Sequence, residues 1–235
     1  MYVVQEFSRF AKQYDSYNMI QKEVAKKLVA MIKRGHYSTI MDIGCGSGVL
    51  YQEIDNREIG FDTFWALDFS SEMLSLHPTN HKVCKQIFDF NSKQYFEALP
   101  TSSNNLILSS SALQWSKDLD FTLCEISRLG SHFYFSLFTS NTFSTLHQVA
   151  NISSPIYSKS YILEILNKYY DFKSTEVSYH LRFDDTRQIL QYIKRSGVSG
   201  GKRQLSYKET KDLILCYPHD YLEFEVLLIE AKLRS

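Results

Sequence analysis

The sequence predicts an α/β fold with a mostly parallel seven-stranded sheet, helices on both faces and a small helical lid after the fifth strand. Short apolar segments of strand length alternate with segments whose apolar residues repeat at helical spacing, which indicates β-α-β units with right-handed crossovers. Polar residues suited to a ligand site follow several of the strand-like segments. The 235 residues, of which 44% are hydrophobic and 22% charged, suffice for one domain with a full core.

The first predicted element is an amphipathic helix over residues 16–34. Its apolar residues, among them Val24 and Leu28, recur on one side at helical spacing, and lysines lie on the other side. We expect residues 1–35 to form an N-terminal cap segment and helix within a single domain that spans residues 1–235.

Strands and helices then alternate as far as residue 138. Ser70 is expected to cap the helix that begins at Ser71, because a serine hydroxyl there accepts a hydrogen bond from a free backbone N–H group. The strands are predicted over residues 39–43, 63–67, 83–88, 106–109 and 133–138, with further helices over 49–55 and 117–129.

The pattern changes after the fifth strand. Residues 142–170 predict one or two helices without an intervening strand, and we interpret them as a candidate helical lid. A long strand with alternating apolar residues follows over 173–183. The chain then continues with helices over 186–196 and 206–216 and a last alternating strand over 221–229.

A glycine-rich segment joins the first strand to the next helix. Gly44, Gly46 and Gly48 occupy alternate positions, which permits a sharp turn and the close approach of a ligand to the backbone. Dinucleotide-binding loops have the spacing G-x-G-x-x-G and bind a pyrophosphate, which Asp42 would repel here. A carboxylate suits a ligand with an ammonium group, such as the methionine moiety of S-adenosylmethionine, and NAD is the weaker alternative. Cys45 is expected to be a small loop residue rather than a nucleophile.

Acidic residues also end the next two strands. Asp68 can accept hydrogen bonds from both hydroxyls of a ribose, and Asp89 can accept one from the adenine amino group. Phe69 and Phe90 follow these acids and are suited to sandwich the adenine ring. Either acid alone would more simply cap a helix or lie in a solvated loop, but three acids at successive strand ends predict a site. The predicted cofactor-binding residues are Asp42, Gly44, Cys45, Gly46, Gly48, Asp68, Phe69, Met73, Asp89, Phe90 and Ser109.

Composition excludes several other classes of function. Lysine plus arginine and aspartate plus glutamate each number 26, so the net charge of zero gives no general attraction to nucleic acid or to an anionic membrane. The four cysteines form no C-x-x-C pair and the seven histidines no ligand spacing, so no metal site is expected. No apolar run reaches the roughly 18 residues of a membrane span, and we expect a cytoplasmic protein.

Several segments carry a resemblance to class I, Rossmann-like methyltransferases, and more narrowly to the malonyl-acyl-carrier-protein O-methyltransferases of biotin synthesis. The sequence departs from that family at Arg128–Ser131, where a Pro-Gly-Gly turn is usual, and at Ser110, where asparagine is common. The resembling segments are Phe7–Asp15 with Gln21 and Val24-Ala25, Ala66–Leu74, Leu108–Trp115 with Asp118-Leu119, Phe135–Phe138 and Ile193–Val198.

The resemblance implies methylation by S-adenosylmethionine of the free carboxylate of malonyl carried on acyl carrier protein, early in biotin (pimeloyl) synthesis. A carboxylate is already ionised at neutral pH, so the reaction requires alignment and exclusion of water but no general base. Arg182, Lys194 and Arg195 are candidates to bind that carboxylate, although each is more simply explained as a surface cation. Tyr14 and Tyr17 either close over the methionine end of the cofactor or pack the N-terminal segment onto the sheet. Gln114 and Trp115 either border the transfer site or, for Trp115, belong to the core.

Acyl carrier protein is acidic, and a basic rim would steer it to the site. The alternatives left open are a class I methyltransferase with another small-molecule acceptor and a non-catalytic protein that binds S-adenosylmethionine. The candidate rim residues are Lys22, Lys26 and Lys27 on one helix face, or Lys194, Arg195, Lys202 and Arg203 near the Gly-Gly loop.

Overall fold

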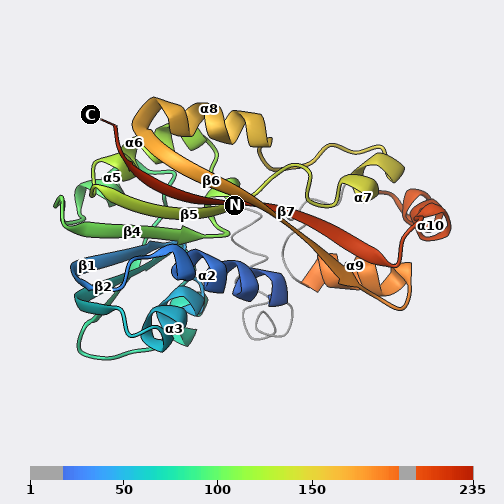
Figure 1. The fold of residues 1–235 in the computed structure, drawn as a ribbon. Helices are drawn as coiled ribbons and strands as arrows, with labels where there is room; N and C mark the ends of the chain where they lie inside the picture. The colour runs from blue at the N-terminus through green and yellow to red at the C-terminus, as the bar shows by residue number, and fades with distance from the viewer. Residues whose placement is uncertain (1–17, 196–204, 235) are drawn as a thin grey trace.

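The computed structural model describes residues 18–195 and 205–234, and a seven-stranded sheet forms its centre (Figure 1). The order of the strands is β3-β2-β1-β4-β5-β7-β6. This confirms the predicted fold class. The strands are β1 (His36–Ile43), β2 (Gly60–Asp68), β3 (Val83–Ile87), β4 (Asn105–Ser110), β5 (His132–Phe138), β6 (Tyr170–Arg182) and β7 (Tyr221–Leu233).

The first five strands are parallel, and β7 lies antiparallel between β5 and β6. From β1 the chain proceeds outward to β2 and β3, then returns to the other side of β1 to form β4 and β5. The strand order therefore reverses between β1 and β4. In open α/β sheets, ligands bind at such a reversal, beyond the carboxyl ends of the strands.

Two separate apolar clusters cover the two faces of the sheet. Helices α2 (Met19–Met31) and α3 (Val49–Asn56) pack on one face. Helices α6 (Leu119–Ser127) and α8 (Lys159–Tyr169), with the short α5 (Lys93–Glu97), pack on the other. Side chains along a strand alternate between the faces, so Val226 of β7 belongs to the first cluster and the adjacent Leu227 to the second. Burial of each such side chain stabilises the fold by about 1.5–3 kcal/mol.

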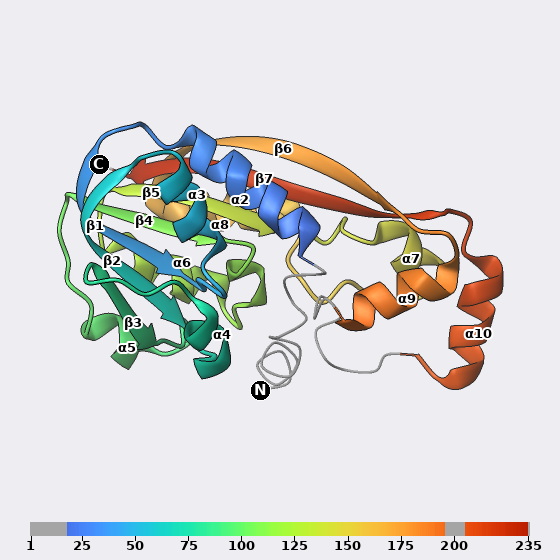
Figure 2. The ribbon, with the colours of Figure 1, turned by 90° about the horizontal axis from the view of Figure 1, so that it is seen from below.

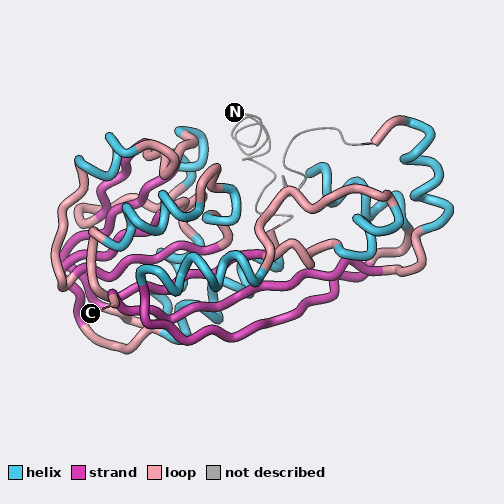
Figure 3. Tube along the Cα trace, turned by 90° about the horizontal axis from the view of Figure 1, so that it is seen from above, coloured by secondary structure: helices cyan, strands magenta, loops and turns pink. Residues whose placement is uncertain are grey.

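The long antiparallel pair β6–β7 continues beyond the parallel strands (Figures 2 and 3). Three further helices gather at its far end and pack into the same cluster as α2 and α3. They are α7 (Ser144–Val149), α9 (Thr186–Arg195) and α10 (Tyr207–Cys216).

The segment expected to form a lid, residues 142–170, contains two helices with different surroundings. In α8, Ile162, Ile165 and Leu166 are buried in the cluster that also contains α6. This helix therefore belongs to the layer that covers the sheet. Helix α7 lies instead at the far end of β6–β7, and a lid function for this part of the segment stays a prediction.

Candidate active site

The glycine-rich loop after β1 adopts a backbone that requires glycine. The φ angles of Gly44, Gly46 and Gly48 are +75°, +53° and +92°, a region that other residues rarely adopt. A Cβ atom on Gly44 would also lie 2.4 Å from the Cβ of Ala112, far inside van der Waals contact. The N–H groups of Gly44 and Cys45 donate to the carbonyl of the β2 residue Leu67, at 2.8 and 3.0 Å. The loop is thereby folded tightly over the end of β2.

Asp68, the last residue of β2, holds this loop in place by hydrogen bonding to its backbone. Its Oδ2 accepts a hydrogen bond from the N–H of Gly46 and its Oδ1 one from the N–H of Ser70, both at 2.9 Å. Burial raises the pKa of Asp68, and the backbone N–H groups of Ser70, Gly46 and Phe69 oppose that rise. An ionised carboxylate offers about four acceptor positions, so Asp68 retains capacity for the hydroxyls of a ligand.

The adjacent helix begins as the sequence predicts. The hydroxyl of Ser70 accepts a hydrogen bond from the N–H of Met73 at 3.2 Å and caps α4 (Ser71–Leu76). The cap directs the chain so that Met73 reaches the same side as Asp68.

Asp42 is a buried carboxylate without a protein partner among the described residues. Its side chain is only 1% exposed, and neither oxygen has a hydrogen-bond partner. Burial raises the pKa of Asp42 well above its usual range, and the negative charge of Asp68 raises it further. Such a group is costly to bury unless a ligand supplies donors or a positive charge.

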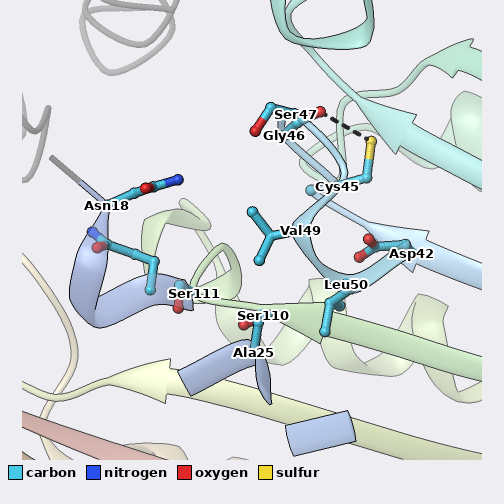
Figure 4. Close-up of a pocket in the computed structure, with 12 residues that line it drawn as sticks. Asn18, Ala25, Asp42, Cys45, Gly46, Ser47, Val49, Leu50, Ser110 and Ser111 are labelled. Carbon is cyan, nitrogen blue, oxygen red and sulfur yellow. Dashed lines mark hydrogen bonds between the residues drawn. The ribbon is translucent and has the colours of Figure 1, made fainter. Parts of the chain in front are cut away.

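Two adjoining cavities that open to solvent lie at the carboxyl ends of β1, β2 and β4, with empty volumes of about 400 and 480 Å³ that include part of this open space. They share Gly44, Gly46, Ser110 and Ser111, and therefore meet above the β1–β4 reversal. The first cavity is also lined by Asn18, Gln21, Ala25, Asp42, Cys45, Ser47, Val49 and Leu50 (Figure 4). The second is also lined by Asp68, Phe69, Met73, Phe90, Ala112 and Trp115.

Most of the predicted cofactor-binding residues line these cavities, but Ser109 and Asp89 do not. Ser109 is fully buried, and its hydroxyl donates to the carbonyl of Ile43 at 2.6 Å. It therefore ties β4 to β1, and its neighbours Ser110 and Ser111 border the cavities instead. Oδ1 of Asp89 accepts hydrogen bonds from the backbone and side-chain nitrogens of Asn91, at 2.9 and 2.8 Å, so this carboxylate stabilises its own turn. Gly48 shapes the loop without lining either cavity.

The predicted substrate residues are divided in the same way. Trp115 is partly buried and lines the second cavity. Gln114 is buried, and its amide nitrogen donates to the carbonyl of Ser111 at 2.7 Å. Arg182 lies at the end of β6, forms a 2.6 Å ion pair with Asp220 and lines neither cavity, so the structure does not place it at the site.

The remaining candidate substrate and rim residues fall into two groups. The three lysines of α2 are exposed, and Lys27 lies over the ring of Tyr179 at 5.1 Å. Tyr14, Tyr17, Lys202 and Arg203, and the side chains of Lys194 and Arg195, lie outside the described residues.

Among the lining residues that were not predicted as ligands, Gln21 and Ser111 stand out. Gln21 lies on the apolar stripe of α2, in helical register with Val24, Ala25 and Leu28, where a polar side chain is unusual. Ser111 has a left-handed backbone, with φ of +58°, at the end of β4. Non-glycine residues in this conformation concentrate at functional sites, but the conformation is not visible in a sequence.

Cys45 agrees with its interpretation as a small loop residue. Burial raises the pKa of its thiol well above the ordinary value, and the charges of Asp42 and Asp68 add to this effect. The thiol therefore stays protonated at neutral pH and is a poor nucleophile. Within residues 18–195 and 205–234, histidines, cysteines and carboxylates form no group that could hold a metal ion.

Comparison with known proteins defines the class. The family described as "Methyltransferase domain" matches residues 41–132. The fold is similar to the YcgJ protein of Bacillus subtilis, with a TM-score of 0.64 at 14% identity over 92% of this chain and 99% of that one. It is also similar to Haemonchus contortus phosphoethanolamine N-methyltransferase 2, solved with S-adenosyl-L-methionine, with a TM-score of 0.60 at 16% identity over 100% of this chain and 60% of that one. The chain is an S-adenosylmethionine-dependent methyltransferase with the class I, Rossmann-like fold.

Curated relatives narrow the resemblance to proteins named malonyl-[acyl-carrier protein] O-methyltransferase. The one from Bacillus anthracis is 24% identical over 228 residues, 88% of this chain and 83% of that one. The one from Neorickettsia risticii is 29% identical over 209 residues, 83% and 81% of the two chains. The one from Erwinia billingiae is 31% identical over 157 residues, 66% and 59% of the two chains. These similarities confirm the resemblance found in the sequence.

The residues of the two cavities fit S-adenosylmethionine. The unpartnered carboxylate of Asp42 suits the ammonium group of the methionine moiety, and Asp68 suits the ribose hydroxyls. Phe69, Met73 and Phe90 give the second cavity an apolar lining suited to the adenine ring. NAD would place a pyrophosphate beside the two carboxylates, which disfavours the dehydrogenase alternative.

Proposed function

We propose that this protein methylates the free carboxylate of malonyl-acyl carrier protein in the cytoplasm, as an early step of biotin (pimeloyl) synthesis. The names and the extent of the curated relatives support this acceptor, because three of them match between two thirds and nine tenths of the chain. No helix in the described parts of the chain has the length and apolar character needed to cross a membrane.

The ionisable groups that line the cavities favour a carboxylate as the methyl acceptor. Among the described lining residues, only Asp42, Cys45 and Asp68 titrate, and histidine and lysine are absent. The two carboxylates fit the cofactor and the thiol stays protonated, so none of the described lining residues is left to remove a proton from an amine or a hydroxyl. A carboxylate acceptor has no proton to lose at neutral pH.

The cofactor supplies a methyl group activated by a positively charged sulfur. The chain then has to hold the acceptor oxygen in line with that group and keep water away. We assign these tasks to Ser111, which lines both cavities, and to Trp115, which lines the second. The hydroxyl of Ser111 is buried without a partner, so it can donate to an acceptor carboxylate.

The charge of the malonyl carboxylate still needs a cationic partner. Arg182 is engaged with Asp220, which leaves Lys194 and Arg195 of α9 as the predicted partners from the sequence. The exposed Lys22, Lys26 and Lys27 of α2 are the predicted contact for acidic carrier protein.

Methyl transfer to defined acceptors tests the proposal. The purified protein is incubated with methyl-labelled S-adenosylmethionine and malonyl-acyl carrier protein, with acetyl-acyl carrier protein as the control that lacks a free carboxylate. We expect a base-labile methyl ester on the malonyl carrier only, together with rescue of biotin-independent growth in a strain that lacks this methyltransferase.

Other outcomes separate the alternatives. Transfer to free malonate or another small acceptor, but to no malonyl thioester, would indicate a small-molecule methyltransferase. Tight S-adenosylmethionine binding without turnover on any acceptor would indicate a non-catalytic binding protein.

A further inference from the structure

Gln21 is a polar residue on the buried face of α2. Its side chain is only 8% exposed, and it shares the buried stripe of the helix with Val24, Ala25 and Leu28. The oxygen Oε1 is buried and has no hydrogen-bond partner in the described structure. A leucine or methionine at this position would pack without that cost, so the amide calls for a functional explanation.

The amide lies on the same cavity as Asp42. Gln21 comes from α2 and Asp42 from the end of β1, and both line the 400 Å³ cavity. Gln21 and Asp42 therefore bring three buried oxygens that accept no hydrogen bond to this cavity, namely Oε1 of Gln21 and both carboxylate oxygens of Asp42, and the buried hydroxyl of Ser111 lines it as well. A hydroxyl supplies one donor and a carboxylate none, whereas an ammonium group supplies three donors and a positive charge. The negative charge of Asp42 and the unpaired oxygens of Asp42 and Gln21 therefore suit an ammonium group better than a hydroxyl or a carboxylate.

We propose that Gln21 accepts a hydrogen bond from the ammonium group of the cofactor's methionine moiety and, with Asp42, makes the site specific for an α-amino acid end. The proposal depends on the binding of S-adenosylmethionine and not on the identity of the methyl acceptor. It assigns to α2 a direct part in cofactor recognition in addition to its packing on the sheet.

Calorimetric titration with three related nucleosides isolates this contact. S-adenosylhomocysteine carries the whole amino acid end, its decarboxylated analogue retains only the amine, and 5′-methylthioadenosine lacks both groups. The test variant is Gln21→Met, which keeps the length and packing of the side chain. Gln21→Leu is prepared in parallel in case the first variant folds poorly, and Gln94→Met at an exposed position of α5 is the matched control.

We expect Gln21→Met to weaken S-adenosylhomocysteine and the decarboxylated analogue by about tenfold or more, the effect of losing one hydrogen bond to a charged group. Binding of 5′-methylthioadenosine should be unchanged, and Gln94→Met should bind all three nucleosides normally. The melting temperature of ligand-free Gln21→Met should equal or exceed that of the wild type, since a buried amide is replaced by an apolar side chain.

Three results would overturn the proposal. Equal weakening of all three nucleosides would show that Gln21 acts only through packing, and unchanged affinities would show that it makes no contact. Weakening of S-adenosylhomocysteine alone would show that the amide binds the carboxylate. Failure of the wild type to bind S-adenosylhomocysteine would overturn the cofactor assignment as well, whereas absence of turnover on malonyl-acyl carrier protein would affect only the proposed acceptor.

Discussion

Asp68 combines two roles at the end of β2, since it binds the backbone of the glycine loop and borders the cofactor cavity. We expect Asp68→Ala to weaken S-adenosylhomocysteine binding by about 2–3 kcal/mol, because ligand hydroxyls and two backbone N–H groups lose a charged acceptor. Calorimetry measures the affinity, and denaturant unfolding measures the accompanying loss of stability. Asp62→Ala is the control, because that side chain is 66% exposed on the same strand. An unchanged affinity would show that the ribose binds elsewhere.

Replacement of Gly44 tests how closely the glycine-rich loop approaches Ala112, which follows β4. Gly44→Ala is expected to destabilise the protein by about 2 kcal/mol or more, since it combines a left-handed backbone with a Cβ contact of 2.4 Å to Ala112. Adding Ala112→Gly removes the contact but not the backbone strain, so the double variant should recover part of the loss. Gly35→Ala is the control, because nothing lies within 4 Å of its added Cβ. Additive effects of the two substitutions would contradict this account.

At the scale of helices and strands, the sequence predicts those features that depend on a local pattern of residues. The positions of the seven strands along the chain follow from apolar runs and from the turns between them, and the cap at Ser70 follows from its position before α4. The position of Asp42 and Asp68 at a common edge of the sheet follows from parallel strands alone. These features depend on near neighbours in the sequence or on the period of a strand or helix.

Features that depend on tertiary packing were not predicted. Helix α5 has only five residues, too few for a helical period to be recognised. Three serines lie together at the end of β4, and it is Ser110 and Ser111, the latter with a left-handed backbone, rather than Ser109 that border the cavities. One oxygen of Asp89 accepts hydrogen bonds from Asn91 in a local turn, and the role of Asp89 in adenine binding stays a prediction.

The N-terminal cap of α6 allows a test of helix stability that does not involve the cofactor site. Oδ1 of Asp118 accepts a hydrogen bond from the N–H of Phe121 at 3.0 Å and caps the helix. Asp118→Ala should lower the free energy of unfolding by about 1 kcal/mol, while Asp118→Ser should retain most of it, because serine is also a good cap. Urea denaturation measures both values. Equal losses in the two variants would show that the carboxylate acts through something other than the cap.

At the scale of the whole molecule, cofactor binding and folding place opposite demands on the buried acids. The site needs an ionised Asp42 to receive an ammonium group and an ionised Asp68 to accept hydrogen bonds from ribose hydroxyls, while the ligand-free fold disfavours both charges. Burial raises the pKa of both Asp42 and Asp68, whereas unfolded aspartates titrate near 3.9. The folded protein therefore retains protons that the unfolded chain has already released.

The pH dependence of stability and of binding should consequently have opposite signs. For the ligand-free protein, the contribution of these acids to stability is fully present below the unfolded pKa and is lost as the pH rises through the higher folded pKa. S-adenosylhomocysteine should bind more tightly over the same rise in pH, by up to about tenfold for each pH unit. Its affinity should then reach a plateau at a pH where Asp42 is ionised even without ligand.

Below the pH of this plateau, binding of S-adenosylhomocysteine should release a proton, which calorimetry detects as a heat that varies with the ionisation enthalpy of the buffer. Asp42→Asn should abolish the part of this release that belongs to Asp42. A wild-type affinity independent of pH, with no proton released, would show that Asp42 is already ionised in the free protein and that its charge is balanced by another group.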